Sequence, residues 1–157
     1  MKKQLLVLSA GILALDLFVK YWIETTLRLG QSITIIPNFF ELTYVRNYGA
    51  AWSLLSGKQF VFLFVTPIII GALVYYYVKQ SEPLHLTAIA FILAGAVGNF
   101  VDRVVFGYVR DMFSFNIFGY AFPVFNVADM AVVFGVFLVI LIILREEMRL
   151  KHEQNND

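Results

Sequence analysis

The sequence predicts a mainly α-helical integral membrane protein, with four transmembrane helices and a small β-hairpin or sheet in the first extracytoplasmic loop. Three observations lead to this fold class. Hydrophobic residues make up 60% of the 157 residues and charged residues 15%, against about 45–50% and about 25% in soluble domains. Four apolar stretches are long enough to cross about 30 Å of hydrocarbon. Between the first two stretches, short segments alternate polar and apolar residues.

The four helices are expected at residues 5–23, 60–78, 84–101 and 124–144. The first contains Asp16 and Lys20, the fourth contains Asp129, and the others carry no Asp, Glu, Lys or Arg. The basic start of the chain and its first apolar run also fit a cleaved signal peptide, but no A-x-A cleavage site follows. Tyr21 and Trp22 suit a membrane interface, so we expect a retained helix.

The two loops on one side of these helices, at about 24–59 and 102–123, complete a single integral membrane domain over residues 1–157. In the first loop, residues 32–35 and 40–45 alternate in polarity around a Pro-Asn turn, which predicts a hairpin with one apolar face. The second loop is rich in Phe, Tyr and Gly. We expect both loops to lie on the membrane surface.

Charge weakly favours cytoplasmic termini. The tails and the short loop between the second and third helices carry six basic residues, and the opposite side carries five, so the positive-inside rule gives only a small preference. The formal net charge of +1 gives no indication of nucleic acid as a partner. Cysteine is absent, which excludes disulfides, thiolate metal sites and a cysteine nucleophile.

Ionisable residues inside a membrane are costly and are therefore candidates for function. Five of them fall in the same leaflet and a sixth lies on the loop beside them: Asp16, Lys20, Asp102, Arg103, Asp129 and Asp111. We expect Asp102 and Arg103 to cap the third helix. Asp129 lies five residues into the predicted fourth helix, roughly 7.5 Å deep at 1.5 Å per residue.

The spacing of these residues predicts specific pairs. Asp16 and Lys20 are four residues apart and share a helix face. Asn99 precedes Asp102 by three residues, and Asn126 precedes Asp129 by three, so each Asn is expected beside its Asp, where its amide can orient the carboxylate.

The first loop adds polar and small residues at its far end. Asn47 and Gly49 are followed by Ala50, Ala51 and Ser53. These small residues would let the backbone approach a ligand closely.

Several chemistries can be tested against this set. A serine nucleophile with a histidine base is excluded, because His85 and His152 fall on the opposite side and no G-x-S-x-G occurs. A zinc protease would need H-E-x-x-H, which is absent.

Three classes of function stay open at this point. Asp102, Asp111 and Asp129 could bind a divalent metal in a membrane lipid phosphotransferase. Two of the three could instead share one proton as a carboxylate pair, and the residues alone do not decide which two. A small proton-coupled transporter is the third class, but the inner halves of the helices offer almost no polar residues for it.

Five motifs in order resemble the lipoprotein signal peptidase (signal peptidase II) family over nearly the whole chain. They are Asp16-x-x-x-Lys20, Asn47-x-Gly49-Ala50-Ala51-x-Ser53, Gly98-Asn99-x-x-Asp102-Arg103, Val109-x-Asp111 and Phe125-Asn126-x-Ala128-Asp129. Two positions depart from the expected pattern, since Trp52 and Met112 stand where Phe is expected. Both keep a large apolar side chain and are expected only to adjust loop packing on the substrate.

The resemblance implies a bacterial intramembrane aspartic peptidase in which Asp111 and Asp129 are the catalytic pair. It implies supporting or substrate-binding roles for Asp16, Lys20, Asn47, Gly49, Asn99, Asp102, Arg103 and Asn126. The implied substrate is a prolipoprotein whose cysteine carries a diacylglyceryl group and which is cut just before that cysteine. Membrane lipids are the other implied partner. No metal or cofactor is implied, and the active site would lie near the outer leaflet of the plasma membrane.

Overall fold

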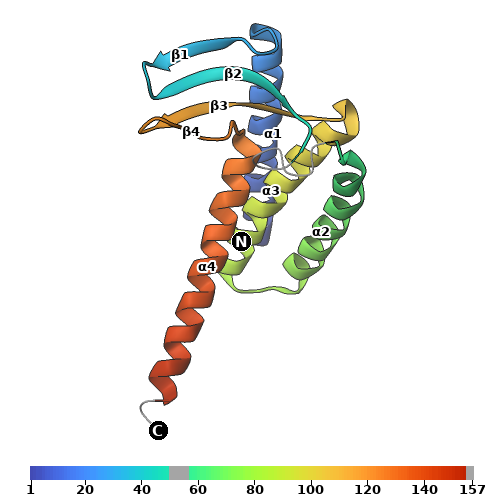
Figure 1. The fold of residues 1–157 in the computed structure, drawn as a ribbon. Coiled ribbons are helices and arrows are strands. Elements are labelled where there is room, and N and C mark those ends of the chain that lie inside the picture. The colour runs from blue at the N-terminus through green and yellow to red at the C-terminus, as the bar shows by residue number, and fades with distance from the viewer. Residues whose placement is uncertain (50–56, 155–157) are drawn as a thin grey trace.

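The computed structural model describes residues 1–49 and 57–154. Four long helices carry a four-stranded antiparallel sheet across one end, and both termini lie away from that sheet (Figure 1). The helices are α1 (Lys2–Thr26), α2 (Gln59–Lys79), α3 (Pro83–Phe106) and α4 (Val127–Gln154). Each has the length and hydropathy of a membrane span. The predicted fold class is therefore confirmed.

Helix α3 is longer than predicted. It begins at Pro83, a residue suited to the first turn of a helix, and it runs to Phe106 rather than ending at 101. Gly107 ends it with a left-handed φ of 76°, and the Gly107 N–H donates to the carbonyl of Arg103. Asp102 and Arg103 consequently lie within the last turns of α3, and the expectation that they cap it was wrong.

Helix α4 begins at Val127 rather than at 124. Residues 124–126 do not start the helix because Phe125 pairs with the sheet: its carbonyl accepts from the N–H groups of Met112 and Phe113. Asp129 is therefore the third residue of α4 and lies in its first turn. It is less deep in the helix than predicted.

Helix α3 packs against each of the other three helices, and glycines allow its closest approach to α4. A Cβ added at Gly95 would clash with the carbonyl oxygen of Ala128, and one added at Gly135 would lie 2.7 Å from the carbonyl oxygen of Ala88. Helix α2 contacts α3 and exposes most of its apolar side chains. That exposure fits a helix surrounded by lipid.

The sheet has the order β1-β2-β3-β4, with strands β1 (Ser32–Ile36), β2 (Phe40–Asn47), β3 (Val109–Ile117) and β4 (Tyr120–Ala121). Strands β1 and β2 form the predicted hairpin, and Asn38 takes a left-handed φ of 59° in its turn. Strands β3 and β4 come from the second loop: β3 pairs with β2 of the first loop, and β4 pairs with β3. The second loop thus forms half of the sheet, and Asp111 lies on a strand rather than in an irregular loop.

A small apolar core joins the sheet to α1. Its buried members are Ile23 and Leu27 from α1, Tyr44 from β2 and Met112 from β3. Met112 is fully buried there, which accounts for a large apolar residue at this position. Trp52, the other departure from the expected pattern, lies outside the described residues.

Candidate active site

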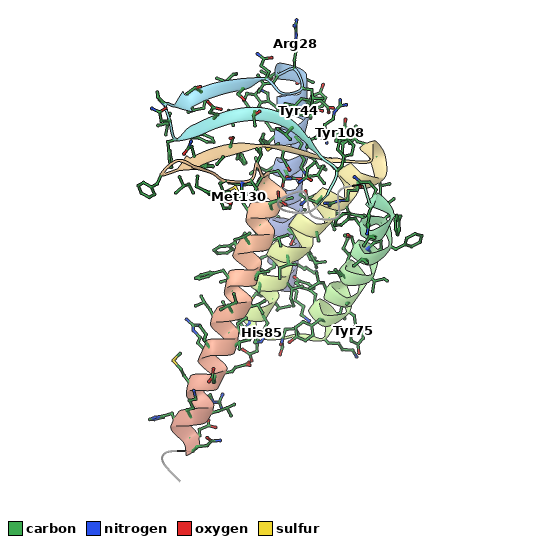
Figure 2. The ribbon with its side chains drawn as sticks, in the orientation of Figure 1. Arg28, Tyr44, Tyr75, His85, Tyr108 and Met130 are labelled. Atoms are coloured by element: carbon green, nitrogen blue, oxygen red, sulfur yellow. The ribbon has the colours of Figure 1, made fainter. Side chains whose placement is uncertain are left out.

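The site lies where the sheet meets α3 and the first turn of α4, at the end of the helices opposite His85. Figure 2 shows Tyr44 and Tyr108 at the sheet end and His85 and Tyr75 at the far end. This agrees with the sequence-based exclusion of a histidine base. The residues gathered at the sheet end come from α1, β2, β3, α3 and α4.

Asp111 is held on both carboxylate oxygens by asparagine amides. Oδ1 accepts from Asn126 Nδ2 at 2.6 Å, and Oδ2 accepts from Asn47 Nδ2 at 2.9 Å. The residue is only 1% exposed. Asn47 faces Val109 in the β2–β3 register, so Asn47 and Asp111 are diagonal neighbours on one face of the sheet.

Asp129 is held in the same way at the start of α4. Its Oδ1 accepts from Asn99 Nδ2 at 2.7 Å, and its Oδ2 accepts from the backbone N–H of Asn126 at 3.2 Å. In return, the Asn126 Oδ1 accepts from the Asp129 N–H at 2.9 Å. This reciprocal pattern is a capping box, and it places the Asp129 carboxylate near the positive end of the helix dipole.

Asn126 links the two aspartates, because its side chain donates to Asp111 and its backbone donates to Asp129. Asn126 lies beside Asp129 as expected, but it orients that carboxylate through its backbone N–H, while its side-chain amide donates to Asp111. Asn99 behaves differently from the prediction: it contacts Asp129 and Lys20, since Asp102 is engaged by basic residues. The paired Phe113 and Phe125 backbones bring β3 and α4 together, so that both aspartates reach Asn126.

The orientation of each asparagine amide is set by a donor on its oxygen. Asn47 Oδ1 accepts from the Gly49 N–H at 2.9 Å, and Asn99 Oδ1 accepts from Lys20 Nζ at 3.0 Å. Asn126 Oδ1 is bound within the capping box. An amide whose oxygen is bound must present its NH₂ group elsewhere. All three NH₂ groups therefore face the two aspartates.

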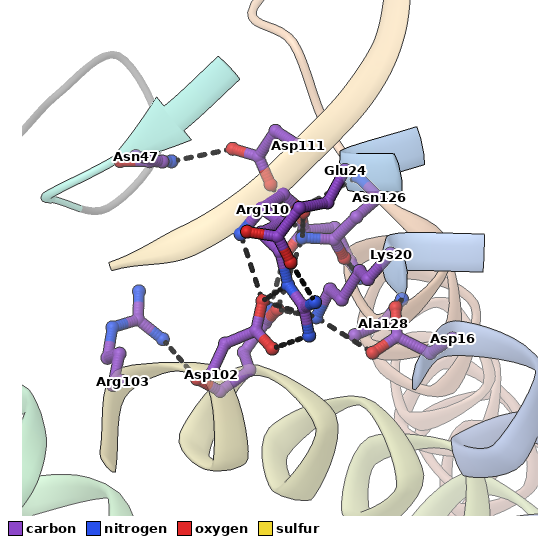
Figure 3. Close-up of polar contacts among 12 residues, drawn as sticks. Asp16, Lys20, Glu24, Asn47, Asp102, Arg103, Arg110, Asp111, Asn126 and Ala128 are labelled. Atoms are coloured by element: carbon purple, nitrogen blue, oxygen red, sulfur yellow. Dashed lines mark hydrogen bonds and ion pairs between the residues drawn. The ribbon is translucent and has the colours of Figure 1, made fainter. Parts of the chain in front are cut away.

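A buried network of charged residues lies next to the two aspartates and includes Asp16, Lys20 and Asp102 (Figure 3). Lys20 Nζ lies 2.7 Å from Asp16 Oδ2 and 3.7 Å from Asp102 Oδ2, which confirms the predicted Asp16–Lys20 pair. Asp16 Oδ1 accepts from the backbone N–H of Ala128 at 2.8 Å, so α1 also caps α4. A Cβ at Gly98 would lie 2.6 Å from Asp16 Oδ2, which explains a glycine there.

Three residues of this network were missed by the sequence-based prediction of the site: Glu24, Tyr44 and Arg110. Arg110 binds both Asp102 and Glu24, and Tyr44 donates to Glu24. Glu24 could have been found, because it follows Asp16 and Lys20 at the same four-residue spacing and so continues their helix face.

Arg103 connects the site to the end of the first loop. Its Nη2 donates to the carbonyl of Gly49 at 3.0 Å, and its guanidinium lies 4.5 Å from the ring centre of Phe62. Gly49 thus uses both its N–H and its carbonyl in the site. The rest of the predicted loop motif, Ala50, Ala51 and Ser53, lies outside the described residues.

A cavity of about 990 Å³ adjoins the site. Asn47, Asn99, Arg103 and Asp129 supply its polar lining, and the remainder is apolar. Among the apolar lining residues, Val133, Phe134 and Phe137 of α4 are 44–68% exposed. The cavity therefore meets the surface that α4 presents to lipid.

Electrostatics favours a proton on Asp111. Burial raises the pKa of the Asp111 carboxyl from 3.8 to about 7, and the nearby charge of Asp129 adds to the rise. The amides of Asn47 and Asn126 oppose it. Asp111 is therefore the carboxyl group of this site whose surroundings favour the protonated form near neutral pH.

The third aspartate of the sequence-based metal hypothesis, Asp102, is engaged elsewhere. Its oxygens are bound by Arg110 and lie near Lys20. Within residues 1–49 and 57–154, no three His, Cys, Asp or Glu side chains are placed to hold a metal ion together.

Comparison with known proteins gives a consistent result. A family model described as Signal peptidase (SPase) II matches residues 8–145. The lipoprotein signal peptidase of Staphylococcus aureus (strain MRSA252) is 41% identical over 151 residues, covering 95% of this chain and 93% of that protein. The protein of the same description from strain JH9 is 40% identical with the same coverage.

Two solved structures, both described as bacterial membrane enzymes determined by the in meso method, have the same fold. The one at 2.3 Å resolution has a TM-score of 0.88 and 41% identity, covering 92% of this chain and 90% of the other. The one at 1.9 Å resolution has a TM-score of 0.83 and 42% identity, covering 90% and 93%.

Proposed function

Because the chain belongs to the signal peptidase II family, and so is an intramembrane aspartic peptidase that processes prolipoproteins, we propose that Asp111 and Asp129 are its catalytic pair. The observation that carries this proposal is Asn126, which donates to both carboxylates. Family membership also favours a peptidase over the phosphotransferase and the transporter that the residues alone left open.

In the proposed mechanism, Asp129 is the general base, because it lines the cavity where water and substrate can reach it. Asp111 is the general acid, because it is buried and its pKa is raised. General acid–base catalysis of this kind contributes about 10²–10⁴-fold per group. The three asparagine amides would hold both carboxyl groups in the orientation that this transfer needs.

The proton transfers balance over one turnover. Asp129 takes a proton from water, whose oxygen bonds to the carbonyl carbon of the scissile peptide. The proton of Asp111 passes to the carbonyl oxygen, which gives a tetrahedral diol. When the diol collapses, the C–N bond breaks, the leaving nitrogen takes the proton held by Asp129, and a diol hydroxyl returns a proton to Asp111.

The cavity supports a lipid-modified substrate. Its volume of about 990 Å³ is at the upper end of small-molecule pockets, which run from about 300 to 1,000 Å³, and its lining is mostly apolar. Because it meets the lipid-facing surface of α4, a diacylglyceryl chain could enter from the bilayer. We propose cleavage just before the lipid-modified cysteine, with the sheet at the outer face and both termini in the cytoplasm.

The first prediction tests substrate and chemistry together. In liposomes with EDTA present, the protein should cleave a prolipoprotein that carries the diacylglyceryl group and leave the unmodified form intact, because only the lipid chains fill the apolar cavity. Product masses should place the cut before the cysteine. Equal cleavage of both forms would contradict the lipid requirement. Inhibition by EDTA that magnesium reverses would restore the metal hypothesis.

The second prediction concerns pH. In the proposed mechanism Asp111 enters the reaction protonated, and its raised pKa of about 7 is the pH at which half of the molecules have lost that proton. Above that pH the Asp111 carboxyl is ionised and can no longer give a proton to the carbonyl oxygen. The rate of cleavage should therefore decline as pH rises from 7 to 9, and it should recover when samples are returned to pH 7. A rate that climbs steadily to pH 9 would contradict a protonated Asp111.

A further inference from the structure

Arg110 stands directly before Asp111 on β3 and is buried, with 4% of its surface exposed. Successive side chains of a strand point to opposite faces. Asp111 turns toward Asn47 and Asn126, whereas Arg110 turns toward α1 and α3 (Figure 3). A burial of this degree is unusual for arginine unless its charge is paired.

One carboxylate, that of Asp102, binds Arg110 through both side chain and backbone. The guanidinium donates from Nη2 to Asp102 Oδ1 at 2.7 Å and from Nε to Oδ2 at 3.2 Å. The backbone N–H of Arg110 donates to the same Oδ2 at 2.9 Å. A bidentate pair of this kind fixes orientation as well as distance. Because a main-chain group takes part, the β3 backbone itself is anchored to α3 one residue before Asp111.

A second set of contacts ties the same guanidinium to α1 and β2. Arg110 Nη1 donates to Glu24 Oε2 at 2.8 Å, and Glu24 Oε1 accepts from the hydroxyl of Tyr44 at 2.9 Å. The guanidinium also lies 4.4 Å from the ring centre of Phe106. Arg110 thereby joins three elements that surround the start of β3.

Arg110 also leaves Lys20 available for the other half of the site. Asp102 lies 3.7 Å from Lys20 but 2.7 Å from Arg110. Lys20 can therefore stay close to Asp16 and donate to Asn99, which in turn orients Asp129. Without Arg110, the buried charge of Asp102 would attract Lys20 and weaken that contact.

We propose that Arg110 is a positioning residue for this peptidase: with Asp102 and Glu24 it holds the backbone of β3 so that Asp111 meets Asn47, Asn126 and the substrate. The inference rests on the proposed catalytic role of Asp111. Arg110 does not line the cavity, so its effect should fall on the chemical step rather than on substrate binding.

The test is steady-state cleavage of the lipid-modified prolipoprotein by the full-length protein in liposomes, per unit of folded enzyme. Arg110→Met removes the charge but keeps an apolar stem over Phe106. It should lower kcat about 10²-fold, the order expected for a misplacement near 1 Å, and leave KM within about threefold because the cavity is unchanged. Arg110→Lys keeps the charge without the bidentate geometry and should recover part of the loss.

Glu24→Gln provides the second arm of the test. Since Glu24 acts through Arg110, the double variant with Arg110→Met should be no slower than Arg110→Met alone. Arg28→Met is the matched control, because Arg28 is exposed and points away from the site (Figure 2), and it should keep the wild-type kcat.

The outcomes separate this inference from the proposed function. Wild-type kcat in Arg110→Met, an effect confined to KM, or fully multiplicative losses with Glu24→Gln would overturn the role of Arg110. If Arg110→Met fails to fold, the test uses Arg110→Lys and Glu24→Gln instead. Wild-type kcat in both of these variants would overturn the proposed role of Arg110. An inactive Asp111→Asn beside an unaffected Arg110→Met would leave the catalytic pair standing, whereas an active Asp111→Asn would remove the proposed pair itself.

Discussion

Replacing either aspartate by asparagine, Asp129→Asn or Asp111→Asn, is expected to lower prolipoprotein cleavage about 10⁴-fold or more, the upper end for one acid–base group. An amide in place of the Asp129 carboxylate could not take a proton from water, and an amide in place of the Asp111 carboxyl could not give one to the carbonyl oxygen. The fold should persist, since Asn126 Oδ1 and Asp16 still cap α4. The measurement is turnover with lipid-modified substrate, together with thermal unfolding of each variant.

Two further comparisons make this result specific to the pair. Glu41→Gln is the same chemical change on the sheet, where Glu41 accepts a hydrogen bond from exposed Thr34, and it should keep full activity. The double aspartate variant should be no slower than either single one, because groups that act as a unit are not additive. Appreciable turnover by a well-folded single variant would falsify the assignment.

Lys20→Met is expected to have the largest effect on stability. Lys20 is completely buried between Asp16 and Asp102. Breaking a buried pair by removing one partner costs about 3–5 kcal/mol, because the remaining charge is left uncompensated. Activity should fall as well, since the Asn99 amide oxygen would lose one of its two donors, Lys20, and keep only Asn126 to orient it toward Asp129. Chemical unfolding in detergent micelles measures the first effect, and cleavage measures the second.

The matched control is Lys3→Met, because Lys3 is an exposed residue of the same helix; its free energy of unfolding should stay close to that of the wild type. The double variant Asp16→Asn with Lys20→Met should recover part of the lost stability, since it removes a charge of each sign. The activity of this double variant should stay as low as that of Lys20→Met. Wild-type stability in Lys20→Met would show that Asp16 and Asp102 do not need this cation.

The helices and the first hairpin could be predicted because their signals are local. Apolar stretches longer than a bilayer is thick identify a span without reference to the rest of the chain, and the alternation around Asn38 is equally local. Strand β3 was not predicted, because its partner β2 lies in the other loop, and the two-residue strand β4 pairs only with β3. Nothing near Asp111 in the sequence indicates that β2 will lie beside it.

The site was predictable in part for a similar reason. The spacing of Asp16 and Lys20 revealed a pair within one helix, and this was confirmed. The choice of Asp111 and Asp129 among three aspartates came from the family resemblance, since their proximity depends on Phe125 joining β3. Arg110 was not among the predicted site residues, because a single arginine in a loop has no spacing that assigns it to one carboxylate, and the structure shows it buried against Asp102.

The contact between Asp16 and Ala128 also bears on when the site can be completed during translation. These residues are 112 positions apart, and Asp129 follows directly. Asp16 and Lys20 belong to the same first helix, but the backbone N–H that binds Asp16 Oδ1 belongs to a helix made near the end of translation. Until that helix has been made, the chain lacks one aspartate of the proposed catalytic pair, so we expect the enzyme to be inactive throughout its own synthesis.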